Sequence, residues 1–592
     1  MKKNTVWTIL VAVITIVLLL VSCGPEKTST APGTTTSKTT TAPPTTSKPT
    51  AEKPKYGGTF IAAQGADTAA WDAATQFDLM GWQISIQNEA LIVVDWAKGP
   101  AGTGETDMTA SHLGQTNLLG GWLAESWELE DSETLIFHLR NNAKWWNKAP
   151  ANGREVTADD IVWNLKTQWE SKGGNFAMFF PSPKEKPISF TARDKLTVEV
   201  KCQPGKQGIQ ILESGARAYI MYPQLYPNQK QWENSLGTGA FMIDDYVPAV
   251  SMTFKRNPNY YGVNPVGPGK GDQLPYIEEL RFPIIPDAST QQSAFRTGKI
   301  DMLGNLEPET FNEMKANTRW AFEYRQGYGF FNQPTGRQDK PNLPFQNIKV
   351  RQAMNFVVDK VAIAEDYYQG QADLMGYPYN SSKPLEAYYT PLEELPQLCQ
   401  DLIKGGNVER AKALMVEAGY PEGFKTQIGC TAADVDILSI VREDLLKIGI
   451  DMEIKQMETG IYFAMDRERS WPEMWFKNAK QSFMPYYMFE MRSESNDSAA
   501  FWDDPECQRV YDDIQKYLGI DDKIWSDELK ALTPLILESS FAIWMPQPYR
   551  YGIWQPWLKN YYGAWTQGNF VPFHHVYFNW IDTDLKKEVL GQ

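Results

Sequence analysis

A strand, an amphipathic helix and a second strand follow one another near the C-terminal third of the chain, and this order restricts the fold more than any other feature. The strands are expected at residues 425–430 and 450–457 and the helix at 435–447, with Gly449 at the second turn. A strand that returns beside its predecessor after one helix forms a parallel pair with a right-handed crossover. The chain is therefore predicted to be an α/β protein.

Other segments repeat this alternation of strand and helix. Thr157 has the character of a helix cap, with Asp159 and Asp160 as first-turn carboxylates rather than a catalytic pair, and Asn407 is expected to cap a later helix. Glycines at 298 and 419 mark two helix ends. The expected strands lie at 135–139, 277–285 and 300–303, and the expected helices at 161–169, 289–297 and 408–418.

The N-terminus has the pattern of a secretory signal. Lys2 and Lys3 precede an uncharged segment over 6–21, which is shorter than the 20 or so apolar residues of a membrane span. The sequence Leu-Val-Ser-Cys that ends at Cys23 resembles the lipobox of bacterial lipoproteins. That resemblance implies cleavage after residue 22 and a diacylglycerol on Cys23, whereas the alternative is an uncleaved signal anchor. We therefore expect an extracytoplasmic protein that is anchored to the membrane by lipid.

Residues 24–55 are rich in Thr, Ser and Pro and contain no aromatic residue, so residues 23–55 are predicted to be a lipidated tether. The folded body begins near Tyr56 and is long enough for three or four structural units. The formal net charge of the whole chain is −15. An acidic body argues against nucleic acid as a partner, because such binding requires Lys and Arg at the phosphates.

Cysteine and histidine patterns do not indicate a metal site or a cofactor. The widely spaced cysteines form either disulfides or buried free thiols, and both alternatives remain open. No GxSxG or HExxH pattern is present, although a glycosidase with two carboxylates remains possible. Gly237 and Gly239 lack the rest of a phosphate loop and are expected in turns. The cysteines discussed here are Cys202, Cys399, Cys430 and Cys507, and the histidines are His112, His138, His574 and His575.

Short motifs in a fixed order connect the chain to a known family. It resembles the dipeptide- and oligopeptide-binding proteins of ABC importers, which form the extracytoplasmic solute-binding family five. The resemblance covers nearly all of residues 56–580. Its motifs are YGGTF at 56–60, LAESW at 123–127, FHLR at 137–140, VTADDI at 156–161, GTG at 237–239, RNPNYY at 256–261, PYIEEL at 275–280, IPDAS at 285–289, GKID at 298–301, VRQAMN at 350–355, DK at 359–360 and the helix at 411–420.

The resemblance implies a two-lobed fold of the type II periplasmic-binding-protein kind with an additional smaller domain. Lobe I would comprise 56–90, 237–322 and 546–592, the small domain 91–236, and lobe II 323–545. Chain crossings near 323–330 and 540–548 would form the hinge. Closure of such lobes around a ligand depends on how much better the ligand binds the closed form.

The resemblance also implies where a ligand lies. Peptide-binding members hold the peptide ammonium with an aspartate in a segment that corresponds to residues 478–485 here. Gln481 occupies the position of that aspartate and Asn478 that of a tryptophan. Because a neutral Gln does not offer the charge-assisted bond that an ammonium favours, the cargo stays open between peptide and oligosaccharide. The expected ligand-binding residues are Trp71, Trp475, Asn478, Gln481 and Tyr486, with Trp471 as a further aromatic candidate.

The expected function is that of a receptor rather than an enzyme. It would capture a small solute and deliver it to an ABC permease, whose separate ATPase supplies the energy. We expect a monomer without a cofactor. A secreted hydrolase and a ligand-gated sensor on the same fold are the alternatives, because the fold alone does not determine the function.

Overall fold

The structure is a computed structural model, and the described residues all belong to the second of its two compact units, residues 51–592. The predicted signal peptide (1–22), Cys23 and nearly all of the tether (23–55) lie outside the described residues. Every structural statement below concerns residues 52–68, 71–74, 82–108, 116–171, 186–207, 210, 215–216, 218–228, 231–329, 332–478, 491–495, 498–517, 521–563, 566–567 and 571–591.

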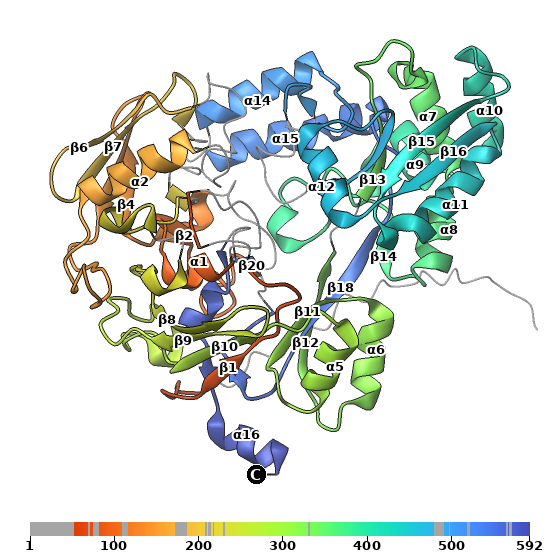
Figure 1. The fold of residues 1–592 in the computed structure, drawn as a ribbon. Coiled ribbons are helices and arrows are strands. Elements are labelled where there is room, and N and C mark those ends of the chain that lie inside the picture. Colours follow the sequence, from red (N-terminus) through yellow and green to blue (C-terminus); the bar gives the residue numbers. More distant parts are fainter. Residues whose placement is uncertain are drawn as a thin grey trace, which may run out of the picture. The chain divides into compact units, whose positions relative to one another are not determined.

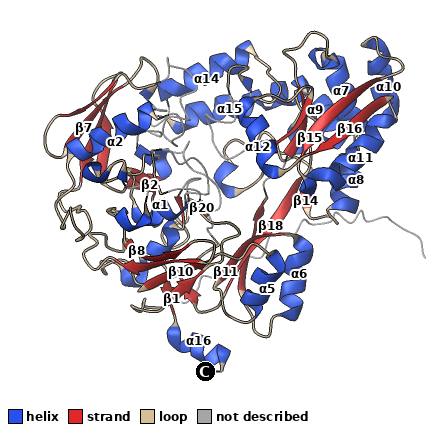
Figure 2. Cartoon of the chain, viewed as in Figure 1, coloured by secondary structure: helices blue, strands red, loops and turns tan. Residues whose placement is uncertain are grey.

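Figure 2 shows that the chain contains both helices and strands, and the strands form four larger sheets. The first sheet has the order β1–β10–β9–β8, the second β11–β18–β12 and the third β13–β17–β15–β16, while the fourth, called the small sheet below, has the order β4–β5–β7–β6. Their strands are β1 (Thr59–Ile61), β4 (Ala124–Leu129), β5 (Thr134–Leu139), β6 (Ser189–Ala192), β7 (Thr197–Lys201), β8 (Phe241–Val247), β9 (Ser251–Arg256), β10 (Glu279–Pro283), β11 (Met302–Leu306), β12 (Glu323–Tyr328), β13 (Asn332–Gly336), β15 (Phe424–Cys430), β16 (Ile450–Gln456), β17 (Met474–Asn478) and β18 (Gln547–Trp554).

Shorter strands and the α-helices accompany these sheets. The remaining strands are β2 (Ile92–Val94), β3 (Leu119–Gly121), β14 (Ala372–Asp373), β19 (Leu558–Lys559), β20 (Thr566–Gln567), β21 (Val571–Pro572) and β22 (Trp580–Ile581). The helices are α1 (Trp82–Gln87), α2 (Ala158–Glu170), α5 (Ala288–Arg296), α6 (Pro308–Asn317), α7 (Ile348–Val357), α8 (Lys360–Ala362), α9 (Gln397–Lys404), α10 (Val408–Glu417), α11 (Val435–Leu446), α12 (Thr459–Glu468), α14 (Pro505–Tyr517), α15 (Asp522–Ser539) and α16 (Thr583–Leu590).

The third sheet confirms the predicted strand, helix and strand unit. Strands β15 and β16 pair in parallel from Phe424 opposite Ile450 to Cys430 opposite Gln456, and α11 connects them. Alternate residues of β15 and β16 are buried, including Ile428 and Met452, because α11 packs against β16 and covers its apolar side chains. The α/β prediction from this segment is therefore correct in both pairing and direction.

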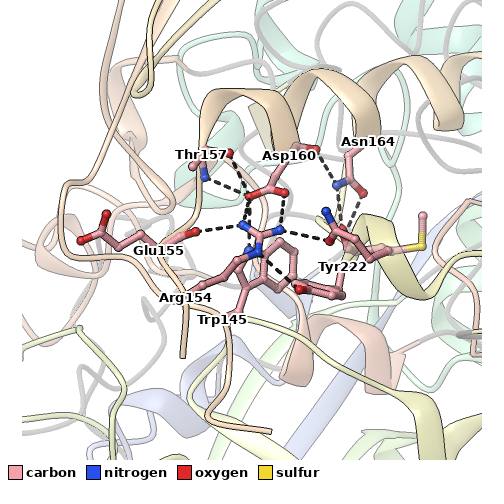
Figure 3. Close-up of polar contacts among 9 residues, drawn as sticks. Trp145, Arg154, Glu155, Thr157, Asp160, Asn164 and Tyr222 are labelled. Atoms are coloured by element: carbon pink, nitrogen blue, oxygen red, sulfur yellow. Dashed lines mark hydrogen bonds and ion pairs between the residues drawn. The ribbon is translucent and has the colours of Figure 1, made fainter. Parts of the chain in front are cut away.

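Helix α2 begins where its capping residues predicted. Thr157 is its N-cap, and its backbone N–H donates to Asp160 Oδ2 at 3.0 Å. Arg154 donates to both Asp160 oxygens at 2.7 Å, and Trp145 Nε1 lies 3.3 Å from Oδ2 (Figure 3). The Asp160 carboxylate is thus a structural acceptor that joins α2 to the preceding loop, as the interpretation of a helix cap requires.

Two strands carry the chain between the second and third sheets (Figure 1), and we call β12 and β18 the crossing strands. They pair antiparallel from Glu323 opposite Trp554 to Tyr328 opposite Tyr549. Beyond that ladder, Thr335 of β13 forms a bridge with Ala542. The predicted chain crossings near 323–330 and 540–548 meet at Gly329, because its N–H donates to the Pro548 oxygen at 3.0 Å and its oxygen accepts from Gln547 Nε2 at 2.9 Å. The domain boundaries and the hinge remain predictions.

The open question about the cysteines has a clear structural outcome. All four described cysteines, Cys202, Cys399, Cys430 and Cys507, are buried free thiols. Gly237 and Gly239, expected in turns, lie in a connecting segment with a bend, and Gly237 is closely packed there, since a Cβ on it would lie 2.0 Å from the backbone oxygen of Gln87. Among the described residues, no group of His, Cys, Asp and Glu is arranged to hold a metal ion.

Candidate functional site

The third sheet presents the carboxyl ends of its parallel strands at one edge. Strands β15, β16 and β17 run in the same direction and end at Cys430, Gln456 and Asn478. Asn332, the first residue of β13, pairs with Asn478 at this edge. Ligands of open α/β sheets bind beyond the carboxyl ends of the strands, so we take this region, called the carboxyl edge, as the candidate site.

A carboxylate lies at the carboxyl edge directly after β15. Asp434 Oδ2 accepts from the backbone N–H of Thr431 at 3.1 Å and from its hydroxyl at 2.6 Å. Asn332 Nδ2 donates to Asp434 Oδ1 at 3.3 Å, so Asp434 connects β15 to β13 across the sheet. Asp434 and Asn332 are both half-buried. Together they supply a carboxylate and an amide, which suit the ammonium, amide or hydroxyl groups of a polar ligand.

A second polar cluster joins the crossing strands to β14. Tyr328 and Tyr549 each donate a hydrogen bond to one oxygen of Asp373, and their ring centroids are 5.5 Å apart. The hydroxyls of Tyr328 and Ser381 lie within 2.8 Å. Burial and the nearby Asp373 charge raise the pKa of both tyrosines, so both hydroxyls stay protonated at neutral pH. The cluster therefore fixes the ends of both crossing strands to β14.

Trp475, a predicted ligand contact, is fully buried in an aromatic stack. Its ring lies 4.5 Å from that of Tyr462 and 5.2 Å from that of Trp471, at interplanar angles of 9° and 18°. Its Nε1 donates to Asp466 on α12 at 2.8 Å. Trp471 is fully buried as well. The sequence predicted that these rings stack on a ligand, but in this structure Trp475 offers no free face to one.

Asp466 also binds the next side chain on the same face of β17. Lys477 Nζ donates to the two Asp466 oxygens at 2.7 and 2.6 Å, and the Lys477 side chain is only 9% exposed. Residues 475 and 477 therefore both point toward α12, since alternate residues of a strand share a face. Asp466 thus fixes the strand that ends at Asn478.

Trp71, the predicted contact from the other lobe, is half-buried and packs edge-on against Tyr246 of β8, with ring centroids 5.2 Å apart. Asp67 fixes this contact, because its Oδ2 accepts from the Tyr246 hydroxyl at 2.8 Å and from the backbone N–H of Ala249 at 2.6 Å. Trp71 is thus attached to the first sheet, whereas Trp475 belongs to the third. The structure does not bring these two rings into one cluster.

The other predicted ligand contacts are not tested by the structure. Gln481 and Tyr486 lie outside the described residues, and for Asn478 only the backbone is described, at the end of β17. Sequence reasoning also missed Asp434, although Thr431 three residues earlier gives the signature of a capping box. The Tyr328, Tyr549 and Asp373 cluster carried no local signal, because its members come from three separate segments.

Comparison with known proteins places the chain in a family. Residues 119–500 match the family described as "Bacterial extracellular solute-binding proteins, family 5 Middle", and the chain therefore belongs to this family of solute-binding proteins. The resemblance that the motifs indicated is confirmed.

Among curated relatives, the heme-binding protein A of Haemophilus influenzae is 28% identical over 326 residues, which are 51% of this chain and 54% of the relative. The dipeptide-binding protein of Escherichia coli is 26% identical over 377 residues, which are 59% of this chain and 65% of the relative. The matches thus span between about half and two thirds of the relatives' lengths.

Solved structures show the fold. The periplasmic binding protein DppA from Helicobacter pylori, solved with the peptide STSA, superposes with a TM-score of 0.68 at 18% identity and covers 89% of this chain and 99% of its own. HbpA2 from Haemophilus parasuis gives 0.66 at 21% identity, with 89% of this chain and 100% of its own covered. The predicted fold, a two-lobed α/β protein of the type II periplasmic-binding kind, is confirmed. No helix in the described part of the chain has the length and apolarity to cross a bilayer.

Proposed function

We propose that the chain is the extracytoplasmic receptor of an ABC importer, which captures a peptide-class solute between two hinged lobes and delivers it to a membrane permease. Membership in the solute-binding family supports the receptor role, and the relatives named for dipeptides support the solute class. The observation that carries the proposal is the position of the carboxyl edge, where β13 begins directly after the crossing strand β12. A ligand held there lies next to the segments that would bend.

The partners follow from that role. The permease would receive the solute, and its ATPase would supply the energy for transport. The lipid on Cys23 would keep the receptor at the membrane. The receptor would act as a monomer. A role without catalysis is consistent with the family, which consists of solute-binding proteins. Turnover is the test of that point, because an enzyme releases a changed product whereas a receptor returns its ligand intact.

An oligosaccharide is the second candidate, favoured by the neutral Gln481 in the place of the ammonium-binding aspartate. The buried stack around Trp475 speaks against it, because sugars bind to free ring faces. Asp434 at the carboxyl edge offers an acceptor for a peptide ammonium instead. The peptide class is therefore the better-supported cargo.

The experiment that tests the proposal is a thermal-shift and calorimetry screen of residues 52–592. The ligands are di- to pentapeptides and cello-, xylo- and manno-oligosaccharides. A ligand at 100 times its dissociation constant adds about 2.7 kcal/mol to the free energy of unfolding, which is readily measured. Peptides are expected to raise the melting temperature. If only sugars raise the melting temperature, the solute is an oligosaccharide rather than a peptide.

A pair of variants then locates the site. Asp434→Asn removes the charge at the carboxyl edge and is expected to weaken the binding of a peptide about tenfold or more, because a charge-assisted bond is lost. Asp436→Asn is the control, since Asp436 is exposed on α11 two residues further on. Equal affinities of the two variants and the parent would place the ammonium elsewhere.

A further inference from the structure

An ion pair connects two segments that are far apart in the sequence and belong to different predicted domains. Lys206 Nζ lies 3.3 Å from Asp512 Oδ1, across 306 residues of chain. Lys206 follows β7 of the small sheet, in the predicted small domain. Asp512 lies on α14, which packs against α15, and α15 in turn contacts α7 and α9 of the predicted lobe II. The pair therefore joins the small domain to lobe II.

The lysine in this pair is well covered. Its side chain is only 16% exposed, and its ammonium lies 4.8 Å from the ring centroid of Tyr511, the neighbour of Asp512 on α14. An ammonium over a tyrosine ring is attracted by the electron-rich face, in addition to its attraction to the carboxylate. Gln508 Nε2 donates to the other oxygen of Asp512 at 3.1 Å and so orients it. Tyr511 and Gln508 of α14 thus order this contact from the side of Asp512.

Tyr511 also contacts a second cation. The Arg492 guanidinium lies 4.4 Å from the centroid of the same ring, and Tyr511 is fully buried. Arg492 lies on the part of the chain that leads from β17 to α14. Strand β17 ends at the carboxyl edge. One ring thus contacts a cation from the small domain and a cation from the chain that follows the candidate site.

A second contact joins the same two predicted domains. Lys383 lies after β14 in predicted lobe II, and its Nζ donates a hydrogen bond to the backbone oxygen of Gly104 in the predicted small domain. Both contacts lie outside the crossing strands, so both must break if the two bodies move apart about those strands. This is the arrangement expected of a closed form rather than of an open one.

We propose that Lys206, Asp512 and Tyr511 form a latch that holds the closed conformation and thereby sets how often the receptor opens. The inference rests on the proposed function, because only a hinged receptor has a closed form whose population matters. Ligand and latch would both favour that form, so breaking the latch shifts the equilibrium toward the open one without any change in the ligand's own contacts. The alternative is a fixed pair between two bodies that do not move.

Distance measurements without ligand test the latch directly. Spin labels are attached in the full-length chain at Lys195→Cys, near the small sheet, and Lys523→Cys, on α15, and their distance distribution is recorded by double electron–electron resonance. Both positions are exposed, with side chains 62% and 80% accessible. The four native thiols of the described body are buried, and burial raises their pKa, so they react slowly with the label.

Lys206→Met, which keeps the apolar stem, and Asp512→Asn are each expected to raise the ratio of long to short distances about two- to fivefold. A salt concentration of 1 M, which screens charges beyond about 3 Å, should shift the parent in the same direction. Asp513→Asn is the matched control, since Asp513 binds Arg509 and Lys516 within α14. The exchange of both charges, Lys206→Asp with Asp512→Lys, should restore the parent distribution.

The result that overturns the latch is a distribution that is unchanged in both single variants. Because the measurement uses no ligand, it is independent of the screen for solutes. If the variants shift toward long distances but no peptide binds in the solute screen, the peptide proposal is refuted and the latch is supported. If peptides bind but the distances in the variants are unchanged, the peptide proposal is supported and the latch is refuted.

Discussion

Replacement of Asp160 by alanine removes one buried carboxylate that several groups share. Its side chain is 5% exposed and accepts from Arg154, the Thr157 backbone and Trp145 Nε1 (Figure 3). The bond to Thr157 is one half of a capping box, worth about 1 kcal/mol. The loss of the acceptor for the buried Trp145 N–H costs about 1–3 kcal/mol. Arg154 is about a third exposed, so its pair adds about 1 kcal/mol at most.

The expected loss is therefore about 2–5 kcal/mol, borne by the region that contains α2 and the small sheet. For a cooperative unit of about 150 residues, 1 kcal/mol corresponds to about 2–4 °C, so we expect the melting temperature of that region to fall by about 4–20 °C. Differential scanning calorimetry measures it, and a melting transition that separates from the rest would show that this region unfolds by itself.

The matched control is Asp159→Ala, one residue earlier in the same helical turn. Asp159 is exposed and contributes its interaction with the helix N-terminus, about 0.3–1 kcal/mol. The reasoning is refuted if the two alanine variants melt within about 2 °C of each other, since the shared acceptor would then contribute no more than a surface charge.

Three other predictions follow from single residues. Burial raises the pKa of Glu89 to about 7, so the stability that its protonation supports is present below pH 4.5 and is lost as the pH rises through 7. Glu89→Gln should remove this loss, which amounts to about 3 kcal/mol, in urea titrations at several pH values. A variant with the same pH dependence as the parent would contradict this prediction. Gln481→Asp restores the acidic residue of the family pattern and should tighten peptide binding about tenfold by calorimetry, while unaltered affinity would mean that segment is misaligned. Cys23→Ser should abolish the incorporation of radiolabelled palmitate into the protein, and incorporation equal to that of the parent would refute lipidation of Cys23.

Local chemistry explains why much of the fold could be predicted. Thr157 and Asn407 cap helices in the structure because their side chains or backbones satisfy N–H groups within three residues. Strands β15 and β16 pair in parallel because one helix separates them. In each case the sequence window contains both partners of the interaction, so the pattern is sufficient.

The candidate site could be predicted only in part, because its partners are distant in sequence. The local sequence does not indicate that Trp475 is fully buried in a stack with Tyr462 and Trp471, since an aromatic side chain has the same local pattern in a core and in a binding site. Asp373 meets Tyr328 and Tyr549 only because three segments converge. Burial is a property of the whole fold, and no single window of sequence contains it.

The pairing of β18 limits where the two bodies can bend. Its C-terminal part pairs with β11 from Tyr551 to Trp554, whereas its first residues, Gln547 and Pro548, pair with β14. Strand β11 belongs to predicted lobe I and β14 to predicted lobe II, so one strand is fastened to both. If the predicted lobes move, we expect the chain to bend near residues 549–550, opposite Gly327, where a Cβ would meet nothing within 4 Å. Because Tyr549 at this point also donates to Asp373, a bend here would act directly on the polar cluster of Tyr328, Tyr549 and Asp373.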